Sequence, residues 1–556
     1  MNSKKIFVVV AVMIAALSSF AQLLHQSVDN LDDKRKLLMV ESAIAGYYVD
    51  DVNESQLVES AIRAMLEELD PHSSYSTKDE TKEMQETMQG SFSGVGIQFR
   101  MEKDTLYVVQ TIAGGPSEKV GIMPGDRFIM VDDSVIAGKK LKNTSIMKLL
   151  RGPKGTKVNI KVKRTGNSDL LDFLIVRDDI PVNSIDAVYM ADSKTGYIRM
   201  SRFAATTFAE YKEAIAKLQK QGMTQLILDL TDNGGGYMNI AVEIANEMLS
   251  RNNLIVYTEG RNSPRRNYNA DGIGKFRSQK VVVMLNQFSA SASEILAGAL
   301  QDWDRGVLVG RRSFGKGLVQ REFLLPDSSS YRLTIARYFT PSGRNIQKPY
   351  KKGDREDYDK DIMDRYNHGE FLSADSIHFD DSLKFTTLRT NRTVYGGGGI
   401  MPDVFVPLDT TKYTSYYRRL TAKGLISQFA IHYVDKHRDV LKTKFSDVDM
   451  FVNGFVVDSD MIDSLVSSAK DEGVVPEGND VANSSDLLAL VIKALIANDI
   501  WGTSAYFQIV NTDNDIYKEA LSIINDDVRY QKILDPRVKT SDKISKPKDD
   551  RPKRLK

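Results

Sequence analysis

The segment from Val281 to Gln320 constrains the fold of this chain more than any other. Val281 to Leu285 is a short apolar run rich in β-branched residues, which predicts a buried strand. From Glu294 apolar residues recur at helical spacing, and Val307 to Val309 then indicates a second buried strand. Repeated strand–turn–helix units of this kind predict a mixed α/β core built of crossover connections.

Polar residues in the same segment suggest a hydrolase. A serine-rich turn precedes the helix, and Lys316 follows the second strand between two glycines. A serine hydroxyl needs a nearby base, and no histidine lies between His72 and His368. A desolvated lysine can serve as that base, because burial disfavours the ammonium form. The helix N-terminus offers unpaired N–H groups to a developing oxyanion, so the segment predicts a Ser–Lys site.

Three other interpretations of these residues stay open. Ser291 followed by Glu294 fits a capping box, so this serine could act only as a helix cap. Residues Gly310 to Gly317 are one residue short of a phosphate-binding loop and lack its final Ser or Thr. Ser313 to Lys316 spells S-x-x-K, which requires a helix that the neighbouring glycines disfavour.

The sequence FSASASEILAGALQD, followed by SFGKGLVQ, resembles the active-site signature of the carboxy-terminal processing peptidases, also called tail-specific proteases. The resemblance implies that Ser291 is the nucleophile, Lys316 the general base and Gln320 the residue that positions the lysine. Lys316 and Gln320 are an even number of residues apart, so on a strand they would share a face. The family also implies a ClpP/crotonase-like core without a cofactor.

The glycine-rich turn TDNGGG, between a predicted strand and a predicted helix, is a candidate oxyanion hole. The resemblance places one N–H donor at Gly236, with Gly235 beside it, and a second at Ala292 after the nucleophile. The family commonly has Arg and Pro in this turn, where this chain has Thr231 and Gly234. This departure bears on the rigidity of the turn more than on its role.

Phe92 to Asp178 consists of short β-runs with glycine turns, and SGVGIQF, GGPSEKVGIMPGD and LLRGPKGTKV resemble a PDZ domain. Such a domain binds a free carboxylate through the N–H groups of one loop and pairs a strand edge with an extended peptide. Here that loop is Gly94, Val95, Gly96 and Ile97. The alternative is that these glycines only make a turn.

Two further residues have weaker assignments. Arg151 is the candidate PDZ residue that senses docking and signals to the catalytic core. Asp302, on the helix after Ser291, is a possible accessory residue, with a surface or salt-bridge role at least as compatible. His72 lies in LDPHSSY, which also resembles the family, and has no catalytic role there.

Composition excludes several classes of function. The net charge of +1 gives no indication of a nucleic-acid partner. The absence of cysteine excludes disulfides, thiolate metal sites, a cysteine nucleophile and a lipid-anchored cysteine. The basic start MNSKK, the apolar run Ile6 to Leu17 and the small residues Ser19 and Ala21 predict a secretory signal. We therefore expect export across a bacterial inner membrane to the periplasm or cell envelope, with an uncleaved anchor left open.

The expected organisation is a multidomain α/β protein. Its regions are a signal peptide (1–21), an N-terminal helical segment (31–90), a PDZ domain (91–178), a serine protease core (180–408), a helical C-terminal domain (409–534) and a disordered basic tail (535–556). Residues 350–390 are charged and irregular, which suggests a long insertion or lid. The helical C-terminal domain lies beyond the motifs and could be a dimerisation arm, a substrate platform or a lid hinge.

Together these patterns predict an exported serine endopeptidase that cleaves proteins near their C-termini through an acyl-enzyme. The PDZ domain would recognise the substrate tail and gate the Ser291–Lys316 dyad. A homodimer and association with the inner membrane stay open. The alternatives are an exported PDZ scaffold or chaperone with an inactive protease core, and a nucleotide-dependent enzyme using Gly310 to Lys316.

Overall fold

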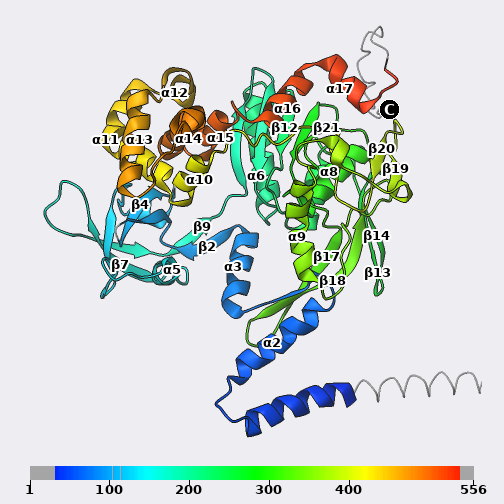
Figure 1. Cartoon of the computed structure of the whole chain (residues 1–556), viewed down its shortest axis with the longest axis horizontal. Coiled ribbons are helices and arrows are strands. Elements are labelled where there is room, and N and C mark those ends of the chain that lie inside the picture. Colours follow the sequence, from blue (N-terminus) through cyan, green and yellow to red (C-terminus); the bar gives the residue numbers. More distant parts are fainter. Residues whose placement is uncertain (1–31, 103, 113, 539–556) are drawn as a thin grey trace, which may run out of the picture. The chain divides into compact units, whose positions relative to one another are not determined.

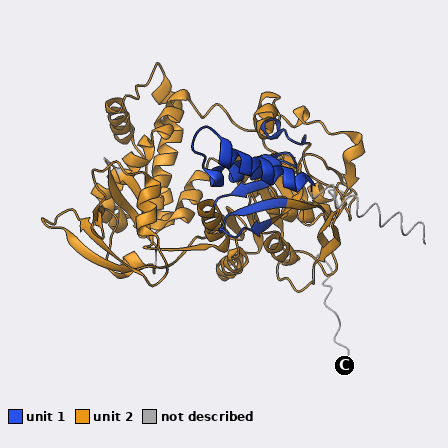
Figure 2. Cartoon of the chain, turned by 90° about the horizontal axis from the view of Figure 1, so that it is seen from below, with its two compact units in different colours: residues 1–77, 322–333, 350–358 blue, residues 78–321, 334–349, 359–556 orange. Residues whose placement is uncertain are grey.

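The computed structural model describes residues 32–102, 104–112 and 114–538 (Figure 1). The expected signal peptide and most of the expected tail lie outside these ranges. The chain divides into two compact units, shown in Figure 2, of which the first holds the described residues up to 77 with 322–333 and 350–358. The second holds residues 78–321, 334–349 and 359 onward.

None of the helices within the described ranges is both long and apolar enough to span a membrane.

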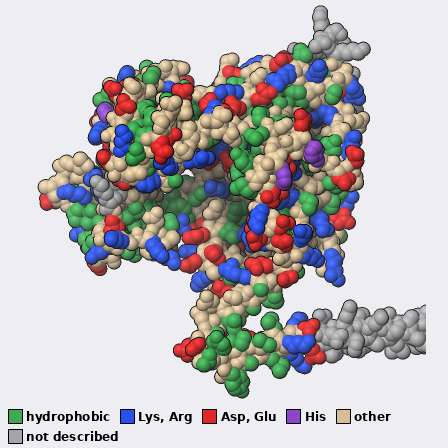
Figure 3. Space-filling view, in the orientation of Figure 1, with side chains coloured by type: hydrophobic (Ala, Val, Ile, Leu, Met, Phe, Trp, Pro, Cys, Tyr) green, Lys and Arg blue, Asp and Glu red, His purple; other side chains and the backbone are tan. Residues whose placement is uncertain are grey.

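The first unit begins with a helix at 32–47 and continues with α2 (Glu54–Glu67) and β1 (Ser74–Ser76). The predicted turn after α2 is held by Asp70, which accepts hydrogen bonds from the backbone of His72 at 2.9 Å and of Ser73 at 3.0 Å. The ring of His72 bonds the hydroxyl of Tyr358 at 2.8 Å, which gives this histidine a structural partner. Helix 32–47 exposes the apolar side chains of Leu37, Leu38, Met39, Val40 and Tyr47. Figure 3 shows hydrophobic side chains on the surface of the N-terminal helices.

The second unit starts with α3 (Lys78–Gln89) and then enters a small sheet through the ribbon of β2 (Ser91–Gly94) and β9 (Asp178–Pro181). The sheet has the strand order β3-β4-β5-β7-β8, with β6 paired to β5, so β3 is an edge strand. Its elements are β3 (Ile97–Glu102), β4 (Thr105–Thr111), α4 (Pro116–Lys119), β5 (Arg127–Val131), β6 (Ser134–Val135), α5 (Asn143–Leu150), β7 (Lys157–Lys163) and β8 (Leu171–Val176).

A six-stranded central sheet of order β10-β11-β12-β15-β16-β21 forms the core of the second unit. All its neighbours are parallel except β10 and β11. Its strands and the helices between them are β10 (Ile185–Met190), β11 (Thr195–Met200), α6 (Thr207–Lys220), β12 (Gln225–Asp229), α7 (Met238–Asn246), β15 (Val281–Leu285), α8 (Ala292–Asp302), β16 (Val307–Gly310) and β21 (Val404–Phe405). The predicted strands at 281–285 and 307–309 are confirmed.

Both faces of the central sheet are covered, which explains why its strands read as unbroken apolar runs. Along β15, Val281, Val283 and Leu285 pack with α7 and α8 in one hydrophobic cluster. Val282 and Met284 point to the opposite face and pack with α16 (Asp515–Asn525) and α17 (Asp527–Leu534). Side chains alternate between the faces of a strand, so one segment contributes to two cores.

A second sheet joins β18 (Ser330–Phe339) to β1, β13 (Leu254–Gly260) and β17 (Leu318–Leu324), with β14 (Ser263–Asn269) beside β13. A short hairpin pairs β19 (Lys384–Thr386) with β20 (Thr393–Tyr395).

The charged stretch expected to be irregular contains the helix α9 (Arg355–Asn367). The helix was missed because charged residues replace the usual apolar stripe: Arg365 is among its buried side chains. Apolar periodicity cannot detect a helix that is held by buried ion pairs.

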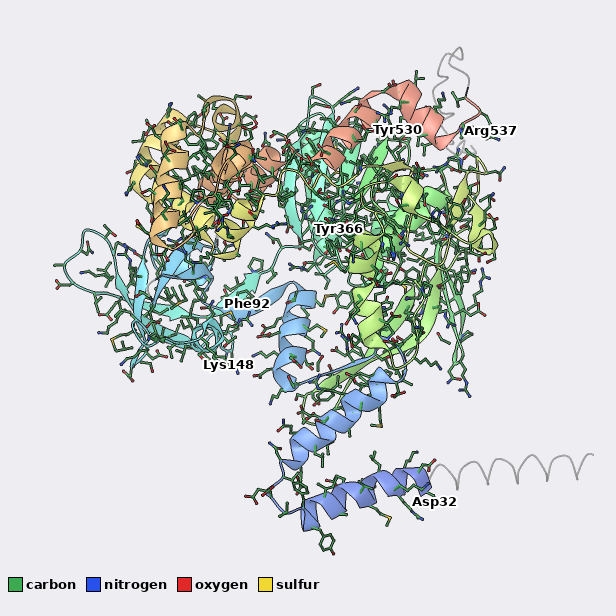
Figure 4. All side chains as sticks on the ribbon, viewed as in Figure 1. Asp32, Phe92, Lys148, Tyr366, Tyr530 and Arg537 are labelled. Carbon is green, nitrogen blue, oxygen red and sulfur yellow. The ribbon has the colours of Figure 1, made fainter. Side chains whose placement is uncertain are left out.

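The helices in the region expected to be a helical C-terminal domain (409–534) contribute to two hydrophobic clusters. One hydrophobic cluster joins α10 (Ser415–Ala422), α11 (Leu425–Lys444), α12 (Val448–Gly454), α13 (Ser459–Asp471), α14 (Asp480–Trp501) and α15 (Thr503–Val510). In contrast, α16 and α17 pack on the central sheet. The hydroxyl of Tyr530, labelled in Figure 4, donates to the carbonyl oxygen of Val281 at 3.1 Å.

Candidate active site

Ser291 occupies a strained turn between β15 and α8. Its backbone angles are φ 57° and ψ −113°, which lie in a region that residues other than glycine rarely adopt. Such strain costs of order 1–3 kcal/mol and persists where the surrounding structure imposes it. All residues of α8 are buried, so the helix start is held rigidly. Ser291 is the N-cap residue of α8, as the capping-box spacing with Glu294 predicts.

The carboxylate of Glu294 connects the serine turn to the loop that carries Lys316. One oxygen, Oε2, accepts the N–H groups of Ser291 at 2.8 Å and of Lys316 at 2.9 Å. The other, Oε1, accepts the N–H of Gly315 at 2.7 Å and the hydroxyl of Ser313 at 2.5 Å. Because a single oxygen binds both N–H groups, the backbone nitrogens of Ser291 and Lys316 lie within two hydrogen-bond lengths of each other.

Burial affects the ionisation of this carboxylate. Glu294 is fully buried, and this desolvation raises its pKa from 4.5 to about 7. The hydrogen bonds from Ser313 and from the three backbone groups favour the charged form and oppose the rise. A carboxyl group with four donors around it accepts all of them only when it is ionised.

The side chains of Lys316 and Gln320 are in direct contact. The ammonium nitrogen Nζ of Lys316 donates to Oε1 of Gln320 at 3.0 Å. The hydroxyl of Tyr338, on β18, is within hydrogen-bond distance of the carbonyl oxygens of both Ser291, at 3.2 Å, and Lys316. The strand β17 follows Lys316 where a phosphate-binding loop would lead into a helix, so that alternative has no geometric support.

The glycine turn contacts the serine directly. A β-carbon placed on Gly235 would lie 2.7 Å from Cβ of Ser291 and 2.7 Å from the carbonyl oxygen of Ala290. The N–H of Gly235 donates to the side chain of Asn233 at 2.9 Å, so this group is already used. Among the described residues, no hydrogen bond is formed by the N–H of Gly236 or of Ala292. The N–H groups of Gly236 and Ala292, the two candidate oxyanion donors, are thus not engaged in these bonds, and Gly235 provides the close approach to Ser291.

Asn233 joins the glycine turn to its surroundings. Its side chain donates to the carbonyl oxygen of Met200 at 2.9 Å, and its own carbonyl oxygen accepts the N–H of Ala290 at 3.0 Å and the hydroxyl of Ser293 at 2.9 Å. Asn233 is fully buried. The turn and the serine segment are therefore one hydrogen-bonded structure, although no sequence motif had singled out this asparagine.

A guanidinium group from the neighbouring strand lies at Thr231. Arg199, on β11, donates to Oγ1 of Thr231 at 2.6 Å and to Oδ2 of Asp229 at 2.7 Å. Asp229 in turn accepts the N–H of Thr231 at 2.8 Å. The turn that lacks the family's arginine in its own sequence is thus stabilised by an arginine supplied from β11.

Three other candidate residues each have structural partners of their own. Asp302 is eleven residues along α8 from Ser291, roughly 16 Å at the rise of a helix. It is fully buried and binds the guanidinium of Arg344 at 2.7 Å, which is a structural role. Arg151 pairs with Glu86 at 3.0 Å and lies over the ring of Phe92, at the base of the β2–β9 ribbon. Ser313, the serine of the S-x-x-K interpretation, is fully buried against Glu294.

The candidate carboxylate loop precedes the edge strand β3. The carbonyl oxygen of Val95 accepts the N–H and the hydroxyl of Ser117, at 3.0 and 2.6 Å. Gly96 has φ +76°, and a β-carbon there would lie 3.0 Å from the side chain of Ile180. The loop is therefore a fixed structure that requires glycine. Within the described ranges, no group of three or more His, Asp or Glu residues could hold a metal ion.

Comparison with known proteins agrees with this geometry. The sequence profile of peptidase family S41 matches residues 194–357, and that of the PDZ domain matches 93–175. The N-terminal domain of the activating protease CtpB matches 10–81, and a family of unknown function (DUF8443) matches 416–502.

Two curated relatives resemble much of the chain. The carboxy-terminal-processing protease of Bartonella bacilliformis is 36% identical over 54% of this chain and 69% of its own length. The carboxy-terminal processing protease CtpA of Bacillus subtilis is 33% identical over 64% of this chain and 78% of its own. A solved structure titled photosystem II D1 C-terminal processing protease is 29% identical over 56% of this chain and 89% of that one, with a TM-score of 0.32.

Ser291 is strained at the start of α8 and lies against a glycine turn of a mostly parallel sheet. Together with the family matches, this geometry defines the class: a serine-type peptidase with an inserted PDZ domain. The N-terminal segment and the helical C-terminal region complete a multidomain α/β fold. Within that class, the chain belongs to the carboxy-terminal processing proteases of peptidase family S41.

Proposed function

We propose that this protease is exported to the cell envelope and cleaves protein substrates near their C-termini through a Ser291–Lys316 dyad. The observation that carries the proposal is the Glu294 carboxylate, because one of its oxygens binds the backbone N–H of both dyad residues. This bond keeps the serine turn and the lysine loop together. A serine far from its base would be inert.

In the proposed mechanism Lys316 acts in its neutral form. Its amine takes the proton from the hydroxyl of Ser291 as the serine oxygen attacks the scissile carbonyl, and then gives the proton to the leaving amine. The bond from Nζ to Gln320 orients the amine. The N–H groups of Gly236 and Ala292 bind the oxyanion of the tetrahedral intermediate. Water then hydrolyses the acyl-enzyme by the same route.

The PDZ domain would select the substrate. Because β3 is at the edge of its sheet, an extended peptide can add to it as a further strand. The N–H groups of the loop Gly94 to Ile97 lie at the start of that strand and would bind the terminal carboxylate. This arrangement explains a preference for chain ends, since only a free C-terminus provides both features.

Replacing either member of the dyad tests the proposal. With an unfolded protein that ends in an apolar tail as substrate, we expect Ser291→Ala and Lys316→Ala to lower kcat/KM by roughly 10⁴-fold. Lys316→Arg should not restore activity, because guanidinium does not give up a proton. Lys384→Ala, at an exposed lysine on β19, is the matched control and should cleave as wild type does.

Equal cleavage by wild type and Ser291→Ala would contradict the proposal. It would instead favour a PDZ scaffold or chaperone, which should bind the tail without cutting it. Saturable binding of ATP in an equilibrium titration would favour the nucleotide-dependent alternative.

A further inference from the structure

The loop that delivers Lys316 is bound by charged residues from outside the part of the chain that matches peptidase family S41. This lysine loop comprises residues 311–316. Arg365, on α9, donates from Nη1 to the carbonyl oxygen of Ser313 at 3.1 Å and from Nη2 to that of Arg312 at 2.9 Å. The family match ends at residue 357, eight residues before Arg365. Tyr366, the next residue of α9, is labelled in Figure 4.

A carboxylate holds this guanidinium in place. Oε2 of Glu370 accepts Nε of Arg365 at 3.1 Å and Nη2 of Arg312 at 2.5 Å. Arg312 also donates from Nη1 to the carbonyl oxygen of Gly398 at 2.7 Å. The side chain of Arg365 is only 4% exposed, and its burial, together with the charge of Arg312, lowers its pKa to about 10. It is therefore still charged at neutral pH, and its guanidinium is fully directed at the loop and Glu370.

A second contact joins α9 to the same loop. Asp361, one turn before Arg365 and so on the same helix face, binds Nζ of Lys348 at 2.9 Å. The ammonium of Lys348 lies over the ring of Phe314 at 4.4 Å, and its backbone N–H donates to the carbonyl oxygen of Gly315 at 2.9 Å. Two charged residues on one face of α9 therefore contact the lysine loop: Arg365 directly, and Asp361 through Lys348.

The loop is consequently bound through both kinds of backbone group. Glu294 accepts the N–H groups of Gly315 and Lys316, whereas Arg365 donates to the carbonyl oxygens of Arg312 and Ser313. Removing either contact leaves buried polar groups without these partners, each of which costs about 1–3 kcal/mol. The loop would relax toward other hydrogen bonds, and Lys316 at its end would move with it.

We propose that Arg365, held by Glu370 and supported by the Asp361–Lys348 pair, is a positioning residue for the catalytic lysine. The helix α9 (Figure 1) thereby supports the catalytic lysine, although most of it, including Asp361 and Arg365, lies beyond the matched residues 194–357. This inference rests on the proposed role of Lys316 as the base. It assigns Arg365 no contact with substrate.

The test compares steady-state kinetics of single variants on one peptide substrate. Arg365→Met keeps the bulk of the side chain and removes its donors, so kcat should fall by about 10²-fold while KM stays within about two-fold. Arg365→Lys should recover part of kcat, because one ammonium can donate to one of the two carbonyl oxygens. Asp364→Asn changes a charge on the exposed side of the same helix and is the matched control.

Glu370→Gln provides a milder version if Arg365→Met does not fold, and it should lower kcat by about ten-fold through loss of the charged partner. Thermal unfolding of each variant gives the folded fraction to which kcat is normalised. A normalised kcat within two-fold of wild type for Arg365→Met, or for Glu370→Gln where the former is unfolded, would overturn the inference. A rise in KM as large as the fall in kcat would also overturn the inference, since loss of positioning acts on turnover and not on substrate binding.

The failure of this inference is distinguishable from failure of the proposed function. If Lys316→Ala is inactive and Arg365→Met is fully active, only the role of α9 is wrong. If Lys316→Ala keeps wild-type activity, the dyad itself is wrong and the inference falls with it.

Discussion

At the scale of single residues, Glu294 has two roles that the sequence pattern could not separate. The spacing Ser291-x-x-Glu294 is that of a capping box, and the carboxylate does accept the N–H of Ser291. The same carboxylate also binds Gly315 and Lys316, which are distant in sequence. A cap contributes to one helix, whereas this group connects two segments of the active site.

The raised pKa of Glu294 leads to a pH prediction. Between pH 4.5 and about 7 the folded protein retains a proton on Glu294 that the unfolded chain has released. The free energy of unfolding therefore falls as pH rises through this window, by up to about 3 kcal/mol, and this contribution is constant above it. Glu294→Gln should lack this fall. Urea unfolding of both proteins at pH 5 and pH 8 measures it, and equal pH differences in the two would contradict the assignment.

At the scale of elements, two adjacent glycines of the turn between β12 and α7 differ in whether they leave room for a side chain. Gly235 has φ +99° and faces Ser291 and Ala290 at contact distances that leave no room for a side chain. Gly234, the preceding residue, has no atom within 4 Å of its would-be β-carbon. The departure from the family's proline therefore falls at a position where a side chain is tolerated.

Alanine substitutions at these two positions should differ strongly. Gly235→Ala forces the turn away from Ser291, so kcat should fall by about 10²-fold or more while the peptide still binds. Gly234→Ala should leave kcat nearly unchanged and is the matched control. The measurement is turnover of a chromogenic peptide together with its KM. Similar losses in both variants would mean that the turn does not act through its contact with Ser291.

At the scale of the whole molecule, the PDZ domain is an insertion whose two ends meet. Gly94 and Asp178 are paired residues of the β2–β9 ribbon, so the chain leaves and re-enters at one place. A domain joined in this way can fold on its own core, and its thirteen-residue buried cluster is separate from those of the central sheet.

Excising the domain tests whether it confers tail specificity. Replacing residues 95–177 by Asn-Gly, a sequence suited to a two-residue hairpin, should leave a folded protease. Wild type should cleave a peptide with a free C-terminus faster than its C-terminal amide, and the excised variant should cleave the two equally. A retained preference in the excised variant would place carboxylate recognition outside the PDZ domain.

Much of the architecture could be predicted, because buried strands such as Val281 to Leu285 consist entirely of apolar residues. The candidate dyad, Gln320 and the glycine turn were predicted from a long motif and its spacing. In the structure, Glu294 of α8 binds the backbone N–H groups of Ser291 and Lys316. The helix α9 and the contacts of Asn233 and Arg199 could not be predicted. Each depends on polar side chains that bind partners distant in sequence, and the local pattern of apolar residues carries no information about such contacts.

The sequence alone determined the strands and helices that carry an apolar period, and which residue types carry the chemistry, because hydrophobic period and motif spacing are local properties. Only the tertiary structure decided that one buried carboxylate binds both Ser291 and Lys316, and that α9 binds the carbonyl groups of the lysine loop. Hydrogen bonds between distant segments require a particular packing of the chain, so they exist only once the elements are assembled.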